Sequence, residues 1–315
     1  MRGLRLPHAE RWLARADIGR VDSADAAAWL GARFELPSPV PVAPVTLAYD
    51  DARHEGLWLR ADPVYARIER DTMTLHHASV LDIERTEADA IVATLQSLFA
   101  ADGLEFRAPR PDRWYVRVPD GELPDTTPLD EVLGRDVFRR LPRGGGRINW
   151  LAAITEVQMV LATHAVNLRR ESVRKPPINC VWFWGGGCVP AVASTPYALI
   201  YAEEPFARGL AALASVRAAS PPGKFPAVDA VRAGESVLVV LDELSLARRG
   251  GDEPAWMSAA QRIDDTWFAT LDNALERFER VRIVLPTGRD TCVATITAGA
   301  RWRLLRSRKP LASHA

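Results

Sequence analysis

The sequence predicts an α/β protein whose second half forms a doubly wound, largely parallel sheet, with a small α+β unit before it. In the second half, buried-strand runs such as "SVLVVLDEL" alternate with helical stretches such as "EPFARGLAALASV". This alternation is typical of parallel sheets covered by helices. Residues 45–119 instead hold short alternating runs, one helix and a returning strand, which is typical of a small α+β unit.

Residues 1–44 are expected to contribute one helix and an extended, proline-rich segment. Ser23 is a candidate N-cap for a helix over residues 23–34. The prolines of the following "LPSPVPVAP" each disfavour helix for the residue before them, so this stretch is expected to be extended.

The α+β unit of residues 45–119 is expected to begin with hairpin strands. Its alternating runs are "VTLAYD", "GLWLRAD", "VYARIER" and "MTLHHA". Residues 86–103 then predict an amphipathic helix, because Ala88, Ile91 and Leu95 fall on one face and Gly103 can end it. "RWYVRV" predicts the returning strand, and residues 120–147 are turn-rich and predict a linker with a short helix.

The α/β core is expected over residues 148–315. A long helix over residues 148–171 leads into the apolar run "CVWFW", which predicts a buried strand. The strands at residues 181–184 and 236–241 are expected to be neighbours or near-neighbours in one sheet. A second long helix over residues 253–278 and further strands complete the core.

Composition argues against several classes of protein. The 315 residues carry 40 Lys plus Arg and 40 Asp plus Glu, and this zero net charge argues against a dedicated nucleic-acid binder, although it leaves room for a local basic patch. Three cysteines without CxxC spacing argue against a disulfide framework or a structural zinc site. Without a signal peptide or a membrane-length apolar run, the expected location is the cytoplasm, with no membrane partner.

Three glycines follow the apolar run and mark the place where a ligand would bind. Gly185, Gly186 and Gly187 stand at the carboxyl end of a strand, and Asp242 follows the next buried strand. A P-loop requires GKS or GKT opening a helix, whereas this chain continues "CVPAVAS". The glycines therefore fit either a phosphate cradle or a sharp turn of the chain, and the turn is favoured.

Two other groups of polar residues have both a structural and a functional interpretation. His164 continues an apolar helix stripe, and Asn167 on the same face is expected to tie the helix to the following loop. Arg60 and Asp62, which flank an expected turn before Pro63, are expected to form an ion pair or to bind an anion, with the ion pair favoured.

Two stretches of the chain resemble the RpfE-type bacterial regulatory proteins. They are "INWLAAITEVQMVLATHAVNLRRESVRKPPINCVWFWGGGCVP" and the upstream "GLWLRADPVYARIERDTMTL". It is also similar to archaeal-type, cofactor-independent phosphoglycerate mutases of the alkaline phosphatase superfamily. That resemblance implies a degenerate alkaline-phosphatase-like core. Through a His-x-x-Asn, Arg and Pro-x-Asn pattern, it adds His164, Asn167, Arg170 and Asn179 to the ligand-binding candidates.

The sequence departs from the mutase pattern where that family holds its metals. The opening Asp-Gly motif and its Ser or Thr nucleophile are missing, and "VLPTGRDT" and "LSLARRGGD" stand where late histidines would be expected. Only Asp242 and Glu243 remain as metal-ligand candidates, so no metal and no cofactor are expected.

The expected function is therefore non-catalytic: a phosphoglycerate-mutase-like regulatory or ligand-binding protein, inactive as a mutase. Its partner would be an unknown small ligand or a protein, and nucleic acid is not expected. The alternative is a metal-dependent phosphotransferase or phosphoglycerate mutase with a rearranged site.

Overall fold

The computed structural model describes residues 4–23, 25–51, 55–70, 72–119, 121, 123–192, 195–225, 232 and 234–303. The chain forms two compact units, each built from separate segments. Unit 1 consists of Met1–Glu35, Ser194–Ala207 and Ser215–Ala315, and unit 2 of Leu36–Ala193 and Arg208–Ala214. The basic stretch "RWRLLRSRKP" near the C-terminus lies largely outside the described residues.

Unit 2 contains an antiparallel sheet of five strands in the order β3-β2-β5-β4, with β8 also paired to β2. The strands are β2 (Leu57–Glu69), β3 (Thr72–His76), β4 (Glu105–Arg110), β5 (Arg113–Val118) and β8 (Cys180–Gly187). Strand β2 is the centre of this sheet because it pairs with β3, β5 and β8 along its length.

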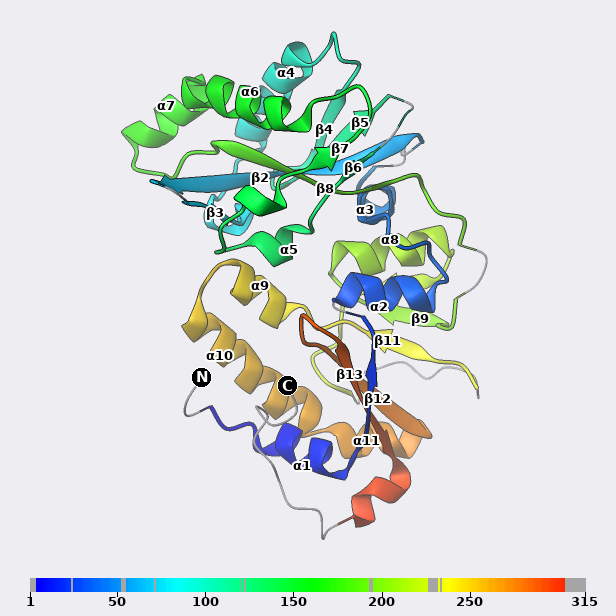
Figure 1. The fold of residues 1–315 in the computed structure, drawn as a ribbon. Helices are drawn as coiled ribbons and strands as arrows, with labels where there is room; N and C mark the ends of the chain where they lie inside the picture. The colour runs from blue at the N-terminus through cyan, green and yellow to red at the C-terminus, as the bar shows by residue number, and fades with distance from the viewer. Residues whose placement is uncertain are drawn as a thin grey trace. The chain divides into compact units, whose positions relative to one another are not determined.

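Helices cover both faces of this sheet (Figure 1). On one face lie α4 (Arg85–Leu98), α6 (Trp150–Ala162) and α7 (Ala165–Ser172), and on the other lie α3 (Val42–Asp50) and α5 (Leu129–Val132). A two-stranded sheet joins β6 (Pro124–Asp125) to β7 (Arg143–Gly144), and short 3-10 turns lie at η1 (Ala78–Val80) and η2 (Phe138–Arg140). The core of the unit includes Leu59, Ile91, Leu95, Trp114, Ile154, Val157, Trp182 and Phe183.

Unit 1 contains two three-stranded sheets. The parallel sheet has the order β10 (Arg217–Ala219), β9 (Leu199–Tyr201), β11 (Val237–Val239). The antiparallel sheet has the order β1 (Asp17–Val21), β13 (Thr291–Thr297), β12 (Arg280–Pro286).

The helices of unit 1 are α1 (Pro7–Arg15), α2 (Ala26–Arg33), α9 (Glu243–Arg249), α10 (Glu253–Ile263), the π-helical η4 (Asp264–Phe268), α11 (Leu271–Arg277) and the 3-10 segment η5 (Ala298–Trp302). Helix α8 (Pro205–Leu213) carries the chain from unit 1 into unit 2. Trp12 and Leu13 of α1 pack with Leu271 of α11 and with Ala294 and Ile296 of β13.

The predicted α/β class is confirmed, and a parallel sheet is present in the second half of the chain. One pairing prediction was wrong: residues 181–184 belong to β8 and pair antiparallel with β2, whereas β11 pairs with β9. An apolar run that is buried on both faces has the same pattern in either kind of sheet, so the sequence does not reveal its partner.

Three local predictions in the first half were also wrong. "VTLAYD" lies in helix α3 and not in a strand, since Pro41 precedes the helix and Pro44 falls in its first turn, where no intrahelical N–H is needed. The turn expected before Pro63 is absent from β2, in which Pro63 stands opposite Val181 of β8. The N-cap of α2 is Asp25, whose carboxylate accepts the N–H of Ala28, and not Ser23.

The two long helices are interrupted. The helix expected over residues 148–171 breaks at His164, and α6 and α7 meet at 53°. The helix over residues 253–278 is interrupted by the π-helical η4. Among the described residues, no single helix is long and apolar enough to cross a membrane, and the bent α6–α7 pair meets the length and composition criteria only when taken together.

Candidate functional site

The three glycines stand at a β-bulge in the pairing of β8 with β2. Trp184 pairs with Arg60 and Gly187 with Trp58, so Gly185 and Gly186 together stand opposite Leu59. Gly185 has a φ of +67°, a left-handed conformation that glycine adopts without a steric cost. An extra residue with a left-handed glycine is the usual construction of a bulge, which bends the strand locally.

Protein atoms occupy the space that side chains would need at all three glycines. A Cβ on Gly185 would lie 3.0 Å from Cβ of Val42, and one on Gly186 would lie 2.7 Å from Cδ2 of Leu59. A Cβ on Gly187 would lie 2.5 Å from Cβ of Pro41. The glycines therefore make room for the start of α3 and for β2, which favours the local-bend interpretation over a phosphate cradle.

Arg60 and Asp62 form the ion pair that the sequence analysis favoured. Nε of Arg60 donates to Oδ1 of Asp62 over 3.1 Å, and a second guanidinium nitrogen contacts the same oxygen. Both residues are buried, with exposed fractions of 9% and 2%. Trp184 donates its indole N–H to Oδ2 of Asp62 over 2.7 Å, and the guanidinium lies over the rings of Trp184 and Tyr115. The pair is therefore satisfied by protein groups.

A second buried ion pair lies next to the first and was not predicted. Arg113 of β5 donates to both oxygens of Asp50, over 2.5 and 2.6 Å, and the Tyr115 hydroxyl donates to Asp50 over 2.6 Å. Burial alone would raise the pKa of Asp50, but the hydrogen bonds and positive charge of Arg113 outweigh it and lower that pKa. Asp50 was not among the predicted site residues, because "VTLAYD" predicted a strand ending at Asp50, whereas Asp50 lies in the last turn of α3.

His164 and Asn167 hold the junction of α6 and α7. His164 is the N-cap of α7, where its Nδ1 accepts the N–H of Val166, and its Nε2 lies 3.0 Å from Oγ1 of Thr94. Burial lowers the pKa of His164. Asn167 donates to the carbonyls of Leu161 and Ile178 and accepts the N–H of Ile178, each over 2.8 Å. This confirms that Asn167 ties the helix to the following loop.

Arg170 and Asn179 also have structural partners. Arg170 is 1% exposed and donates to the carbonyls of Pro176 and Leu81 and, over 2.6 Å, to the carboxylate of Glu87. Asn179 donates to the carbonyl of Ala66 and accepts its N–H, so its amide extends the pairing with β2. The polar candidates in unit 2 thus use their hydrogen bonds to hold helices and strands together.

Asp242 belongs to unit 1 and follows β11 of the parallel sheet. Because carboxyl ends of parallel strands meet at one edge, Asp242 shares this edge with Glu203 and Glu204, which follow β9. Glu204 accepts the N–H groups of Phe206 and Ala207, over 3.0 and 2.8 Å, and thereby caps α8. We call Glu203, Glu204, Asp242 and Glu243 the carboxylate edge.

The electrostatics of the carboxylate edge show mutual repulsion. Burial raises the pKa of Asp242, the charges of Glu203 and Glu243 add to that effect, and Arg249 opposes it. Burial also raises the pKa of Glu204, although two backbone hydrogen bonds counteract it. Such an edge attracts cations, but a transition metal in a catalytic site usually requires three convergent protein ligands.

The carboxylate edge does not supply such a set. Among the described residues, the one group of three ligand atoms within 4.8 Å of one another is His8, Asp264 and Asp265. Asp264 in that group already accepts the N–H groups of His8 and Ala9 at the start of α1. In the part of the chain that the structure describes, the side chains around Asp242 therefore form no such group of three ligand atoms.

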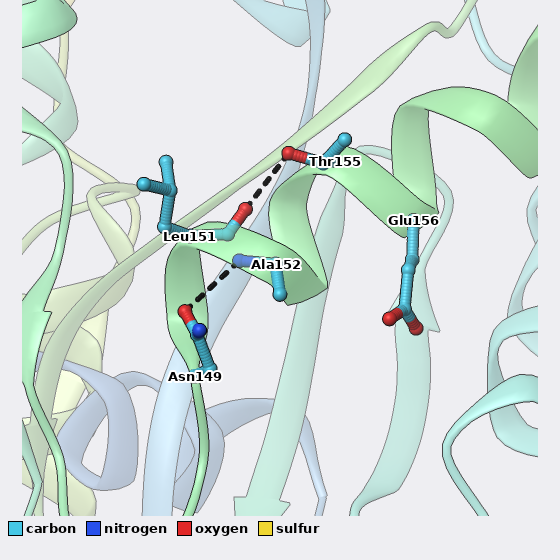
Figure 2. Close-up of a pocket in the computed structure, with 5 residues that line it drawn as sticks. All are labelled: Asn149, Leu151, Ala152, Thr155 and Glu156. Atoms are coloured by element: carbon cyan, nitrogen blue, oxygen red, sulfur yellow. Dashed lines mark hydrogen bonds between the residues drawn. The ribbon is translucent and has the colours of Figure 1, made fainter.

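A shallow pocket of about 340 Å³ lies on the exposed side of α6 (Figure 2). Its lining is Asn149, Leu151, Ala152, Thr155 and Glu156. Asn149 caps the helix by accepting the N–H of Ala152 over 3.1 Å. None of these lining residues is a candidate from the sequence analysis, so the pocket adds no support to the predicted site.

The comparisons with known proteins agree with an α/β protein related to phosphoglycerate mutases. No family model matches the chain. It is 28% identical over 147 residues to the 2,3-bisphosphoglycerate-independent phosphoglycerate mutase of Methanosarcina mazei, covering 44% of this chain and 36% of that enzyme. The corresponding enzyme of Methanothrix thermoacetophila is 26% identical over 169 residues, covering 48% of this chain and 43% of that enzyme.

One solved structure shows the same fold. A protein from Pyrococcus horikoshii superposes with a TM-score of 0.52 at 11% identity, covering 96% of this chain and 83% of that one. The chain is thus similar to cofactor-independent phosphoglycerate mutases at low identity, and its matches span less than half the length of these two curated relatives.

Proposed function

We propose that this chain is a non-catalytic, phosphoglycerate-mutase-like protein that binds a ligand or a partner and acts in regulation. The observation that carries the proposal is the composition of the carboxylate edge. Asp242 is surrounded by carboxylates and Arg249, and the described residues supply no imidazole there. The resemblance of residues 148–190 to RpfE-type regulatory proteins supports the regulatory part.

The chemistry of phosphoryl transfer explains why this composition matters. Mutases of this superfamily need a hydroxyl nucleophile activated on metal, so that the charge of the transferring phosphoryl group is neutralised. The sequence lacks the opening Asp-Gly motif with its nucleophile and the late histidines. Residues that act as a unit in catalysis do not compensate for one another, so a site that lacks several of them is not expected to turn over.

The test is an assay with 3-phosphoglycerate and with p-nitrophenyl phosphate, each with Mn²⁺ or Co²⁺ supplied. We expect no turnover above a heat-inactivated control. Turnover that scales with metal and disappears in Asp242→Ala would show that the carboxylate edge is a working site, and would contradict the proposal. Metal-dependent turnover that Asp242→Ala retains would instead favour a metal site elsewhere in the chain, which is the second candidate function.

The second candidate is a metal-dependent phosphotransferase with a rearranged site. It is favoured by the grouping of His8, Asp264 and Asp265. His8→Ala separates the two functions: it would abolish metal-dependent turnover under this alternative and change nothing under the first proposal. His76→Ala, a half-buried histidine of unit 2, is the matched control.

A further inference from the structure

An arginine-rich stretch of unit 2 has few carboxylate partners among the described residues. Residues 135–147, here the arginine segment, contain five arginines, Arg135, Arg139, Arg140, Arg143 and Arg147, all of them exposed. Within the described part of the chain, the one ion pair of the segment joins Arg140 to Glu131 over 3.4 Å. Asp125 stands opposite Arg143 in the β6–β7 register without forming an ion pair.

Exposed arginines elsewhere in the chain are often paired. Examples are Arg20 with Asp290, Arg85 with Asp89 and Arg262 with Glu243. The arginine segment holds five arginines against the single carboxylate of Asp136, a local charge of +4 (five minus one) in a chain whose net charge is zero. Such a concentration of like charge costs stability unless an anionic partner offsets it.

Backbone contacts and one buried side chain hold the arginine segment in place, and Arg143 also donates to the carbonyl of Arg139 over 3.5 Å. Val137 is fully buried, and its N–H donates to the carbonyl of Met73 over 3.0 Å. Asp136 accepts the N–H of Met73 over 3.3 Å, and β7 pairs with β6. The segment, which follows α5 and includes β7 in Figure 1, is thus an ordered platform that presents its arginines to solvent.

The segment also presents an exposed aromatic ring next to two of its arginines. Phe138 is 49% exposed and stands beside Arg139 and Arg140. Between Arg143 and Arg147, Gly144 and Gly146 are exposed, whereas Gly145 is buried against the indole of Trp150. Arginine binds phosphate in a bidentate manner and stacks on bases, and an exposed aromatic ring offers a stacking surface for a base.

We propose that the arginine segment binds single-stranded nucleic acid, through arginine–phosphate contacts and stacking of a base on Phe138. The charges are spread along 13 residues, which suits an extended polyanion better than one small anion. An anionic membrane would favour a wider apolar face than one phenylalanine, and an acidic peptide would leave the ring without a role. The zero net charge of the whole chain is compatible with binding of a nucleic acid to a local, positively charged patch.

The experiment is fluorescence anisotropy of a labelled single-stranded RNA of about 15 nucleotides, titrated with the full chain from about 50 to 200 mM salt. We expect the Kd to increase as the salt concentration rises. Arg139→Ala with Arg143→Ala should weaken binding about tenfold and reduce the slope of log K against log salt by about 1.4, since each phosphate contact contributes about 0.7. Phe138→Ala should weaken binding about fivefold with the slope unchanged.

The matched control removes the same charge elsewhere in unit 2. Arg67→Ala with Arg169→Ala changes two other exposed arginines and should alter Kd by less than about twofold. Thermal unfolding of each variant checks that it folds. The proposal is overturned if the RNA does not bind at low salt, or if both double variants weaken binding equally. It is also overturned if vesicles with anionic lipid or a poly-glutamate peptide bind more tightly than the RNA.

Discussion

Trp184 donates its indole N–H to Asp62 over 2.7 Å, one residue before the chain enters the glycine bulge. The same carboxylate accepts from Arg60, whose guanidinium lies over the Trp184 ring. One buried junction between β2 and β8 therefore joins three features that are separate in the sequence. They are an aromatic run, a glycine run and an Arg-x-Asp pair.

The first prediction concerns the buried Arg60–Asp62 pair. Asp62→Asn keeps the size of the side chain but leaves the Arg60 charge without its counter-ion, so it should lower the free energy of unfolding by about 3 kcal/mol. Urea denaturation measures this difference. The control is Glu69→Gln at the exposed Arg67–Glu69 pair, which should cost less than about 1 kcal/mol.

A loss at Asp62 no larger than the loss at Glu69 would contradict this account of the junction. A double variant, Arg60→Met with Asp62→Leu, provides a further check because it removes both charges at once. Replacing both partners with apolar groups should recover most of the stability lost in Asp62→Asn.

The second prediction tests the role of the bulge glycines. Gly185→Ala should cost about 1–2 kcal/mol for the positive φ, and more because the new Cβ meets Val42. Gly134 has the same φ of +67° with open space around it, so Gly134→Ala measures the backbone cost alone. The difference between the two variants in thermal or urea unfolding reports the crowding against α3.

A phosphate cradle would give another result. Inorganic phosphate should leave the melting temperature of the native chain unchanged, apart from the shift that an equal concentration of sulfate produces. A phosphate-specific rise that Gly185→Ala removes would mean that the glycines bind an anion after all.

The third prediction concerns acid stability and the Asp50–Arg113 pair. The pKa of Asp50 is lower in the folded chain than the value of about 3.9 expected in the unfolded chain. The stabilisation by this carboxylate is therefore fully present above that unfolded value and is lost as the pH falls through the folded value. Asp50→Asn should be less stable at neutral pH and should lose less stability between about pH 5 and pH 2. This prediction would be contradicted if the curves of unfolding free energy against pH ran parallel for the native chain and for Asp50→Asn.

Local side-chain roles could be predicted where the partners are close in sequence. The Arg60–Asp62 pair is separated by one residue, and the tie of Asn167 to its following loop spans eleven residues. In both cases, the hydrogen-bonding needs of a buried polar group limit the available partners. The same argument did not reveal Asp50, because its partner Arg113 is 63 residues away.

Sheet membership could not be predicted because it depends on distant pairing. The run "CVWFW" has the pattern of a strand buried on both faces, and nothing in it distinguishes β2 from β9 as a neighbour. The prolines before α3 were misleading for a different reason. A proline disfavours helix for the residue before it, yet it is well tolerated in the first turn of a helix that starts there.

The last prediction separates the structural and ligand-binding interpretations of the His164–Asn167 pair. Asn167 is 5% exposed and makes three hydrogen bonds that join the end of α6 to Ile178 before β8. Asn167→Ala leaves those backbone groups unsatisfied and should cost about 2–4 kcal/mol. His164→Ala removes one N-cap bond at a half-buried position and should cost about 1 kcal/mol. Urea denaturation gives both values, and a structural role requires the larger loss at Asn167. If both variants unfold like the native chain, the side chains are free for a ligand and the structural interpretation of this junction is wrong.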